Sequence, residues 1–305
     1  MTTRQGDGET GRRGEKKSRR PAGSHRGRKS PRHPVTPSPG PRVPVITLLT
    51  DFGSADYFVG AVKGAILSIS PDACIVDITH EIPPQDIAAG AFTLLAAYGS
   101  FPAGTIHLCV VDPGVGSARR PVLVSAGEQL FVGPDNGVFS YIIERESGAR
   151  VFHVTNQKYF RASVSATFHG RDVFAPVAAA LSTGVKPAGF GEEIHDYARL
   201  ASLSPKSLRN GDLRARIIHI DRFGNCITNL TPADLTPRMI EGGARLKVNG
   251  KEIKTFRRFF SEGGGNQPFA VWGSAGFLEL AAKNRSAARL LKAKRGDMVQ
   301  VSVRS

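Results

Sequence analysis

The sequence predicts an α/β protein, with a mostly parallel α/β sandwich in its N-terminal part and a smaller antiparallel sheet or barrel in its C-terminal part. Two observations predict this fold class. Up to about residue 184, continuous apolar strands alternate with amphipathic helices, as in a parallel sheet covered on both faces. After about residue 205, short strand candidates follow one another closely. We therefore expect two folded domains, at 43–205 and 206–305.

The first strand candidate spans 45–49 and runs into the sequence Thr-Asp-Phe-Gly. A helix follows it, with apolar residues at helical spacing at Phe58, Val62, Ile66 and Ile69. A second helix opens near Asp86, and a third, at about 172–181, is closed by Gly184. The other strands expected in this half lie at 74–78, 106–111, 122–125, 129–132 and 151–154.

The second half consists mainly of short strands. Asn249-Gly250 separates two of them and is a strong signal of a two-residue hairpin. The stretch Ser-Pro-Lys-Ser at 204–207 is the expected linker between the two halves. The strands expected after it lie at 217–220, 226–230, 245–248, 252–256, 269–272, 277–281 and 299–303.

The net charge of +15 is concentrated at the N-terminus. Residues 1–42 carry twelve Lys or Arg and three Asp or Glu, whereas residues 43–305 carry 29 and 23. The tail lacks Leu, Ile and Phe and is rich in Gly, Pro, Ser and Arg, so we expect it to be disordered. It has no apolar segment like that of a signal peptide. A solvated extension is the preferred interpretation, and a basic arm that touches nucleic acid is the alternative.

The apolar stretches and cysteines indicate neither a membrane span nor a metal site. The longest largely apolar stretch, 87–101, contains two glycines and is shorter than the roughly 18–20 residues that cross a bilayer. The cysteines Cys74, Cys109 and Cys226 are odd in number and far apart, so neither a disulfide framework nor a zinc spacing follows. A reducing cytoplasm is the expected location.

Polar loops follow the predicted strands, where ligands bind in open α/β sheets. Asp51 and Asp56 follow the first strand, where they could hold a ribose diol and an ammonium; alternatively, Asp51 caps the next helix. Asp112 follows another strand and precedes a Pro/Gly-rich turn with Arg119 and Arg120. This turn indicates an anion-binding or water-binding pocket, or else a surface turn with an ion pair. Its glycines lack the third glycine of a dinucleotide fingerprint.

Three further loops carry candidate functional residues. His169 lies directly before a helix, where a histidine suits proton transfer, although a lone loop histidine can also be structural. Asp172 is expected as the N-cap or first-turn acid of that helix. Asp221 and Asn225 share a polar turn, and the Asn225 amide suits the edge of adenine. Ser274 lies in a turn of small residues that a ligand can approach closely. Either of the last two turns could instead be a hairpin connection.

Seven short motifs occur in order along the chain. They are Leu-Thr-Asp-Phe-Gly (49–53), Asp-Ile-Thr-His (77–80), Phe-Pro-Ala-Gly-Thr (101–105), Val-Val-Asp-Pro-Gly-Val-Gly (110–116), Pro-Asp-Asn-Gly (134–137), Thr-Phe-His-Gly-Arg-Asp (167–172) and Phe-Gly-Asn (223–225). Together they resemble the S-adenosylmethionine hydroxide adenosyltransferase family, relatives of the fluorinating and chlorinating nucleosidyl enzymes. The resemblance implies an N-terminal α/β domain, a C-terminal β-barrel, and trimers with each pocket built between domains of adjacent subunits.

The resemblance also implies a set of catalytic residues. The family places an Asp/Arg/His set around a nucleophilic water, which in this chain corresponds to Asp112, Arg119 and His169. Arg120 is a near neighbour that could be confused with Arg119. The halogenating relatives lack this set and carry a tyrosine and a halide-binding serine where this chain has His169 and Gly170. That difference favours water over halide.

Ligand contacts follow from the same resemblance. The implied contacts are ribose at Asp51, the methionine ammonium at Asp56 and Asp221, adenine at Asn225, and the methionine end at Ser274. The chain departs from the family pattern at 284–287, where Asn-Arg-Ser-Ala stands in place of an asparagine followed by glycine. The contacts on the adenine side are therefore open at that point.

The implied reaction is hydrolysis of S-adenosyl-L-methionine (SAM) by in-line attack of water on the ribose 5′ carbon, giving adenosine and L-methionine. No metal or organic cofactor is implied. His169 could accept the proton while Asp112 orients it, and Arg119 would stabilise hydroxide character. The alternatives are halide-dependent adenosyl transfer and a non-catalytic module that binds a nucleoside or nucleic acid. Against nucleic acid, residues 43–305 lack aromatic residues interleaved with basic ones in the manner of a stacking platform.

Overall fold

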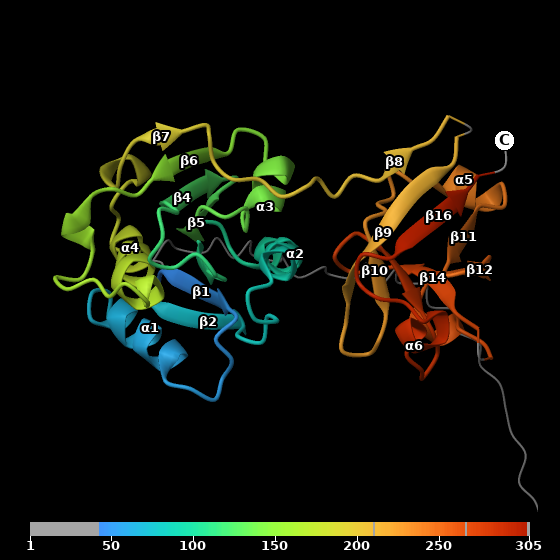
Figure 1. Ribbon diagram of the computed structural model, residues 1–305, viewed down its shortest axis with the longest axis horizontal. Helices are drawn as coiled ribbons and strands as arrows, with labels where there is room; N and C mark the ends of the chain where they lie inside the picture. The colour runs from blue at the N-terminus through green and yellow to red at the C-terminus, as the bar shows by residue number, and fades with distance from the viewer. Residues whose placement is uncertain (1–42, 210, 266, 304–305) are drawn as a thin grey trace, which may run out of the picture. The chain divides into compact units, whose positions relative to one another are not determined.

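The strands form two separate sheets in the computed structural model, which describes residues 43–209, 211–265 and 267–303 (Figure 1). The strands of the first sheet lie between residues 45 and 194, and those of the second between 206 and 302. The expectations for the basic tail concern residues 1–42, which are outside the described part of the chain.

The first sheet has seven strands, and all five strands expected after the first are among them. The strands are β1 (Val45–Thr50), β2 (Cys74–Thr79), β3 (Ile106–Val110), β4 (Pro121–Ala126), β5 (Gln129–Pro134), β6 (Arg150–His153) and β7 (Glu193–Ile194). The helices are α1 (Phe58–Leu67), α2 (Ile87–Ala97), α3 (Ser140–Arg145) and α4 (Ala175–Ser182). Shorter helical turns lie at Tyr98–Ser100, Gln157–Tyr159, Gly170–Phe174 and Pro187–Gly189.

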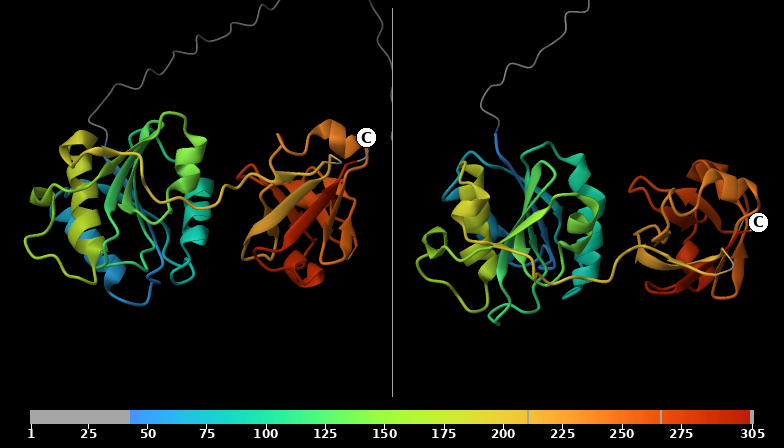
Figure 2. Two further views of the ribbon diagram at one scale, coloured as in Figure 1. Left: turned by 45° about the horizontal axis from the view of Figure 1, so that its top comes forward. Right: turned by 90° about the horizontal axis from the view of Figure 1, so that it is seen from above.

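Helices cover both faces of this sheet, as the sequence predicts (Figure 2). Successive residues of a strand point to opposite faces, so β1 contributes to two cores. Ile46 packs into one core with residues of α1 and α4, and Leu49 into the other with residues of α2 and α3. Burial on both faces explains why the central strands read as continuous apolar runs.

The prediction of a mostly parallel sheet is wrong, because the sheet is mixed. Its order is β2-β1-β3-β5-β4-β6-β7. The pairs β1–β2, β1–β3 and β3–β5 are parallel, and the pairs β4–β5, β4–β6 and β6–β7 are antiparallel. Gly127-Glu128 alone separates β4 from β5, and a two-residue connection can join only antiparallel strands. The antiparallel half begins at this hairpin.

Asp86 and Asp172 are acidic residues that the sequence predicts at helix N-termini. Asp86 caps α2, and its Oδ1 accepts a hydrogen bond from the backbone N–H of Ala89. Asp172 is confirmed as a first-turn acid of the helical segment that starts at Gly170 and runs into α4, although it is not the N-cap. It lies inside a π-helical turn, fully buried, where its carboxylate is paired with Arg171 and accepts the N–H of Ser165.

The second sheet has nine strands that pair antiparallel, except for one parallel pair, β13–β14. The strands are β8 (Lys206–Ser207), β9 (Leu213–Ile220), β10 (Cys226–Thr228), β11 (Arg245–Val248), β12 (Lys251–Ile253), β13 (Phe256–Arg257), β14 (Phe269–Trp272), β15 (Leu278–Ala281) and β16 (Met298–Ser302). Two short helices that the sequence did not predict, α5 (Pro237–Glu241) and α6 (Ala287–Leu291), and a helical turn at Phe260–Glu262 lie between strands.

The turn predictions in this half have mixed outcomes. The Asn249-Gly250 hairpin is confirmed: Val248 pairs with Lys251, and φ is +48° at Asn249 and +78° at Gly250. Part of the expected linker is instead strand β8, which pairs with β9. The hydrogen-bonded order runs β12-β11-β16-β9-β10-β15-β14-β13, and no ladder among the described residues joins β12 to β13. The pairing among the described residues therefore forms an antiparallel sheet, and closure of this sheet into a barrel stays a prediction.

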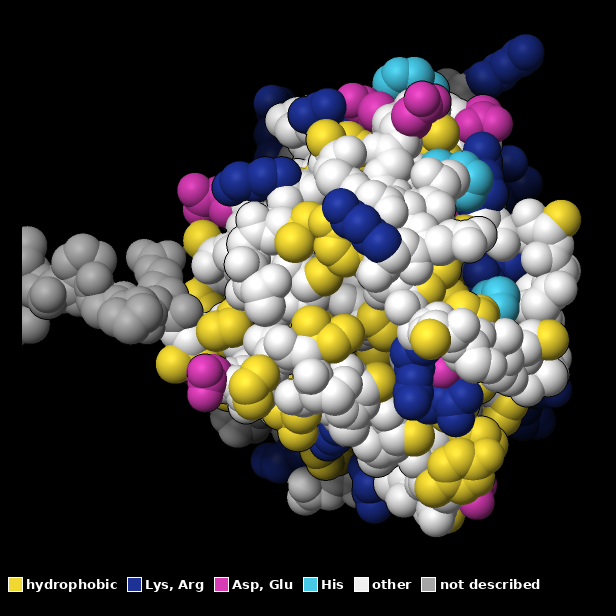
Figure 3. Space-filling model, turned by 90° about the vertical axis from the view of Figure 1, so that its left-hand side faces the viewer, with side chains coloured by type: hydrophobic (Ala, Val, Ile, Leu, Met, Phe, Trp, Pro, Cys, Tyr) yellow, Lys and Arg dark blue, Asp and Glu magenta, His cyan; other side chains and the backbone are white. Residues whose placement is uncertain are grey.

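Among the residues that the structure describes, those on the face shown in Figure 3 form no continuous basic patch. The Lys and Arg side chains of this face lie in separate groups among hydrophobic and acidic ones. In the part of the chain that the structure describes, no helix is both long and apolar enough to cross a bilayer.

Candidate active site

Two polar loops leave the first sheet at the same edge. Asp51 directly follows β1, and Asp112 lies two residues beyond the end of β3. Because β1 and β3 are parallel neighbours, their carboxyl ends meet at this edge. Ligands bind at such an edge in open α/β sheets.

Asp112, Arg119 and His169 form one hydrogen-bonded cluster. Arg119 donates from Nε to Oδ1 of Asp112 at 2.9 Å and from Nη2 to Oδ2 at 2.5 Å. The same Nη2 lies 2.7 Å from Nδ1 of His169, which is 50 positions further along the chain. The side chains of Arg119 and Asp112 are only 8% and 4% exposed. The structure thus brings together the three residues that the sequence selected.

The contact with Arg119 fixes the tautomer of His169. A guanidinium only donates hydrogen bonds, so Nδ1 of His169 accepts and the neutral ring carries its proton on Nε2. Burial, followed by the charge of Arg119, lowers the pKa of His169 and favours this neutral form. The ring then offers an N–H donor and has no free acceptor. This arrangement does not fit the expectation that His169 takes a proton from water.

The structure also separates the two adjacent arginines. Arg120 pairs with Asp135 at 2.7 Å and with Asp196 at 2.9 Å. Arg119 instead turns toward Asp112, with its guanidinium carbon 5.1 Å from the centre of the Phe174 ring. Only Arg119 therefore belongs to the cluster.

Gly116 allows the loop after Asp112 to pack against the loop before His169. Its φ is +78°, a conformation that side chains disfavour. A Cβ built on Gly116 would lie 2.4 Å from the carbonyl oxygen of Ala166, three residues before His169. The close approach of these two backbones keeps Arg119 and His169 near each other.

Asp51 is held by a backbone contact rather than by a helix end. Its Oδ2 accepts the N–H of Gln85 at 2.8 Å, and Gln85 has a φ of +66°. The interpretation of Asp51 as a helix cap is therefore wrong. Asp56, in the same loop, is exposed to solvent.

His80 supports this loop from the end of β2. Its Nδ1 lies 2.9 Å from Oγ1 of Thr50, and its backbone carbonyl accepts the N–H of Gly53 at 2.8 Å. In the sequence, His80 stands out only as part of the 77–80 motif, and no local pattern indicates a role for Gln85. The contacts of His80 and Gln85 with the loop after β1 depend on the tertiary structure, which places the loops after β1 and β2 side by side.

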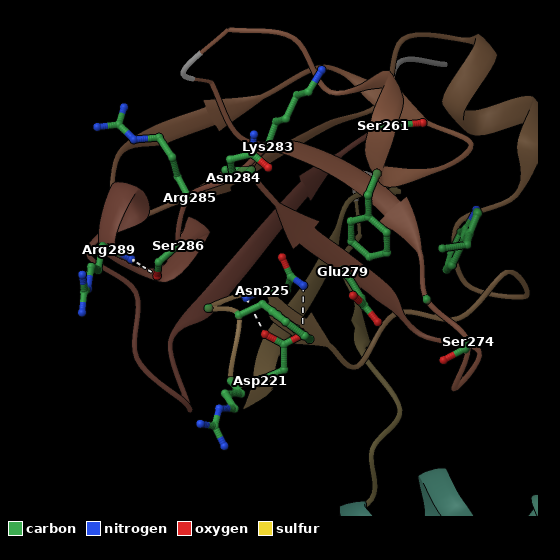
Figure 4. Close-up of a pocket in the computed structure, with 17 residues that line it drawn as sticks. Asp221, Asn225, Ser261, Ser274, Glu279, Lys283, Asn284, Arg285, Ser286 and Arg289 are labelled. Carbon is green, nitrogen blue, oxygen red and sulfur yellow. Dashed lines mark hydrogen bonds between the residues drawn. The ribbon is translucent and has the colours of Figure 1, made fainter.

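A separate pocket of about 1000 Å³ opens on the second sheet (Figure 4). The residues that the sequence assigned to this half, Asp221, Asn225 and Ser274, all line it. Phe260, Trp272 and Glu279, which the sequence did not single out, line it as well.

Within this pocket, Asn225 holds the Asp221 carboxylate in place. The backbone N–H of Asn225 donates to Oδ1 of Asp221 at 2.8 Å, and its Nδ2 donates to Oδ2 at 2.9 Å. Among the described residues no partner takes the second side-chain N–H or the amide oxygen of Asn225, so both remain for a ligand. The residues at 283–286 also line the pocket, and Asn284 adopts a φ of +54° where the family pattern differs.

The candidate residues thus form two groups, one on each sheet. Asp51, Asp56 and the cluster of Asp112, Arg119 and His169 belong to the first sheet. Asp221, Asn225 and Ser274 belong to the second, and no hydrogen bond or ion pair between described residues joins the two groups. Within the described range, no group of three or more His, Cys, Asp or Glu side chains could hold a metal ion.

A carboxylate–arginine–histidine cluster beside the strand ends of one sheet and a polar pocket on a second sheet are typical of an enzyme that acts on a small polar molecule. The family model of the SAM hydroxide adenosyltransferase N-terminal domain matches residues 46–191, and that of the C-terminal domain matches residues 215–300. The chain belongs to the SAM hydroxide adenosyltransferase family.

Relatives over nearly the whole length agree with this assignment. The (R)-S-adenosyl-L-methionine hydrolase of Thermus thermophilus is 38% identical over 263 residues, covering 84% of this chain and 98% of that protein. The fluorinase of Actinoplanes sp. is 28% identical, covering 78% and 90%. The crystal structure of an uncharacterized conserved protein from Thermotoga maritima superposes with a TM-score of 0.79 at 33% identity, covering 84% and 99%.

Proposed function

We propose that this chain hydrolyses SAM at the ribose 5′ carbon and releases adenosine and L-methionine. The observation that carries the proposal is the bridge that Arg119 makes between Asp112 and His169. The Thermus thermophilus relative, an (R)-S-adenosyl-L-methionine hydrolase, supports the same reaction. No cofactor enters the proposal.

The reaction is an in-line displacement. The C5′–O bond forms as the C5′–S bond breaks, and the electron pair leaves with sulfur. The sulfonium is a good leaving group, so positioning and deprotonating the water is the remaining task. Neutralisation of a sulfonium by hydroxide is favoured where bulk water is excluded, and the low exposure of Asp112 and Arg119 suits that condition.

The hydrogen bonds support a particular division of labour within the cluster. His169 orients the water by donating from Nε2, since its Nδ1 is engaged by Arg119. Asp112 takes the proton on Oδ1, which accepts one hydrogen bond from Nε of Arg119 and keeps a lone pair, whereas Oδ2 accepts from both Nε and Nη2. Arg119 stabilises the hydroxide character that develops on the attacking oxygen.

The substrate contacts that we propose use both sheets. Asp51 holds the ribose diol, Asp56 and Asp221 the methionine ammonium, Asn225 the adenine edge, and Ser274 the methionine end. The fixed carboxylate of Asp221 and the free amide oxygen of Asn225 support the assignments in the second sheet.

Product analysis tests the reaction directly. Purified protein is incubated with SAM, with and without chloride or fluoride, and the products are separated. We expect adenosine and L-methionine in every mixture. A halogenated nucleoside would identify halide-dependent adenosyl transfer, the alternative raised by the fluorinase relative. Unchanged SAM that remains bound would indicate a binding module.

We further propose that the chain has two domains, at 43–205 and 206–305, and that the second closes as a β-barrel. We also propose that the protein is a cytoplasmic homotrimer in which each active site combines domains of adjacent subunits. The separation of the candidate residues into two groups supports shared sites, and a stable trimer needs interfaces on the order of 2,000 Å². Co-expressed Asp51→Ala and Asp221→Ala chains should recover part of the activity, because one defect lies on each side of the boundary. A fully active monomer by light scattering, or inactive mixed trimers, would contradict the shared site.

A further inference from the structure

Glu279 is the acidic residue of the second-sheet pocket that the proposed function does not use. It lies on β15, between its cross-strand partners Ile227 on β10 and Val271 on β14. Its side chain lines the pocket and extends between Asn225 and Ser274 in Figure 4. A central strand with ladders on both sides fixes the direction of this side chain.

The Glu279 carboxyl is partly withdrawn from water, in a region where the described residues offer it no hydrogen-bond donor. Among the described residues, none forms a hydrogen bond or an ion pair with it. One of its oxygens lies against Gly273, where an added Cβ would be 1.9 Å away. Burial and the nearby Asp221 charge raise the pKa of Glu279. A carboxylate in such surroundings is stabilised by a ligand that brings a positive charge and N–H donors.

The neighbouring carboxylate is arranged differently. Both oxygens of Asp221 are held by Asn225, so Asp221 is preorganised, whereas Glu279 is left to the ligand. Two carboxylates that repel each other within one pocket favour a cation placed between them. The Gly273–Ser274 turn, against which Glu279 lies, is where the methionine end of the substrate is proposed to bind.

We propose that Glu279 is a second carboxylate for the substrate's methionine ammonium, acting together with Asp221. An ammonium has three donors and can serve both carboxylates at once, whereas the sulfonium has none. The proposal rests on the proposed function in one respect only, namely that this pocket holds the SAM skeleton. It makes Glu279 a residue that selects amino-acid-bearing nucleosides over plain ones.

Two non-reacting nucleosides separate this role from a contact to adenine. S-adenosyl-L-homocysteine and 5′-methylthioadenosine share the adenine, the ribose and a thioether sulfur, but only the first carries the ammonium. Their dissociation constants are measured by calorimetry with the full-length protein and with Glu279→Gln. Glu252→Gln is the matched control, because Glu252 lies on the same sheet outside the pocket and is paired with Arg245 and Lys254.

Glu279→Gln should weaken the binding of S-adenosyl-L-homocysteine about tenfold, equivalent to about 1.4 kcal/mol, and change the dissociation constant of 5′-methylthioadenosine by less than about twofold. Glu279→Asp keeps the negative charge and should therefore lose less affinity for S-adenosyl-L-homocysteine. Equal weakening of both nucleosides would assign Glu279 to adenine and overturn the proposal, as would no change in either. Wild-type protein that binds neither nucleoside would also overturn it. Wild-type protein that discriminates between them but forms no adenosine from SAM would refute the hydrolysis alone.

Discussion

Gly116→Ala should cost much more activity than its size suggests. The residue sits at φ +78°, and its Cβ would lie 2.4 Å from the backbone oxygen of Ala166. A left-handed conformation costs a non-glycine residue about 1–2 kcal/mol. The contact adds a displacement, since ordinary van der Waals separations begin near 3.4 Å. One of the two loops must therefore move by roughly 1 Å.

That displacement falls on the catalytic cluster. Ala166 precedes His169 by three residues, and Gly116 precedes Arg119 by three. The two loops meet in the 2.7 Å contact between Arg119 and His169. A misplacement of about 1 Å at a reacting group can cost on the order of 100-fold in rate. We expect kcat to fall on that scale, with substrate affinity changed much less.

Gly104→Ala is the matched control. Gly104 has a φ of +85°, but no atom lies within 4 Å of its added Cβ, and it precedes β3 at the opposite edge of the sheet. Both variants should unfold at lower urea concentration, whereas only Gly116→Ala should lose adenosine formation. A folded Gly116→Ala protein as active as Gly104→Ala would refute the reasoning.

Three other outcomes are expected. Asp112→Ala and His169→Ala should each slow turnover by at least ~100-fold, the scale of a lost acid–base or orienting group; near-normal turnover in both would exclude the cluster from catalysis. Burial lowers the pKa of His107 from 6.5 to about 4, so the unfolded state binds more protons between these values. Stability should therefore fall by about 3 kcal/mol as pH falls through that window, and urea unfolding of His107→Gln should lack this loss; an unchanged pH dependence would contradict it. Deletion of residues 2–42 should leave the kinetics of adenosine formation intact while weakening any salt-sensitive nucleic-acid binding, and loss of activity in a folded truncated protein would show that the tail has a catalytic role.

Local sequence patterns determined much of this protein. Apolar periodicity located the strands β1 to β6 and the helices α1, α2 and α4 to within a few residues. The Asn249-Gly250 dipeptide determined a hairpin, because its two residues tolerate the positive φ that the turn requires. Motif order along the chain was sufficient to select Asp112, Arg119 and His169, since the family match depends on linear spacing.

Tertiary structure decided what depends on the path of the backbone between distant residues. Strand direction in the first sheet is not encoded in apolar patterns, and it changes at the two-residue turn before β5, where the antiparallel pairs begin. The buried position of Asp172, the ion pairs of Arg120 with Asp135 and Asp196, and the tautomer of His169 follow from contacts between separate loops. The same holds for Glu279, whose surroundings are set by strands β10 and β14 on either side. Local sequence fixes which side chains a loop carries, but only the packed sheet fixes which groups those side chains meet.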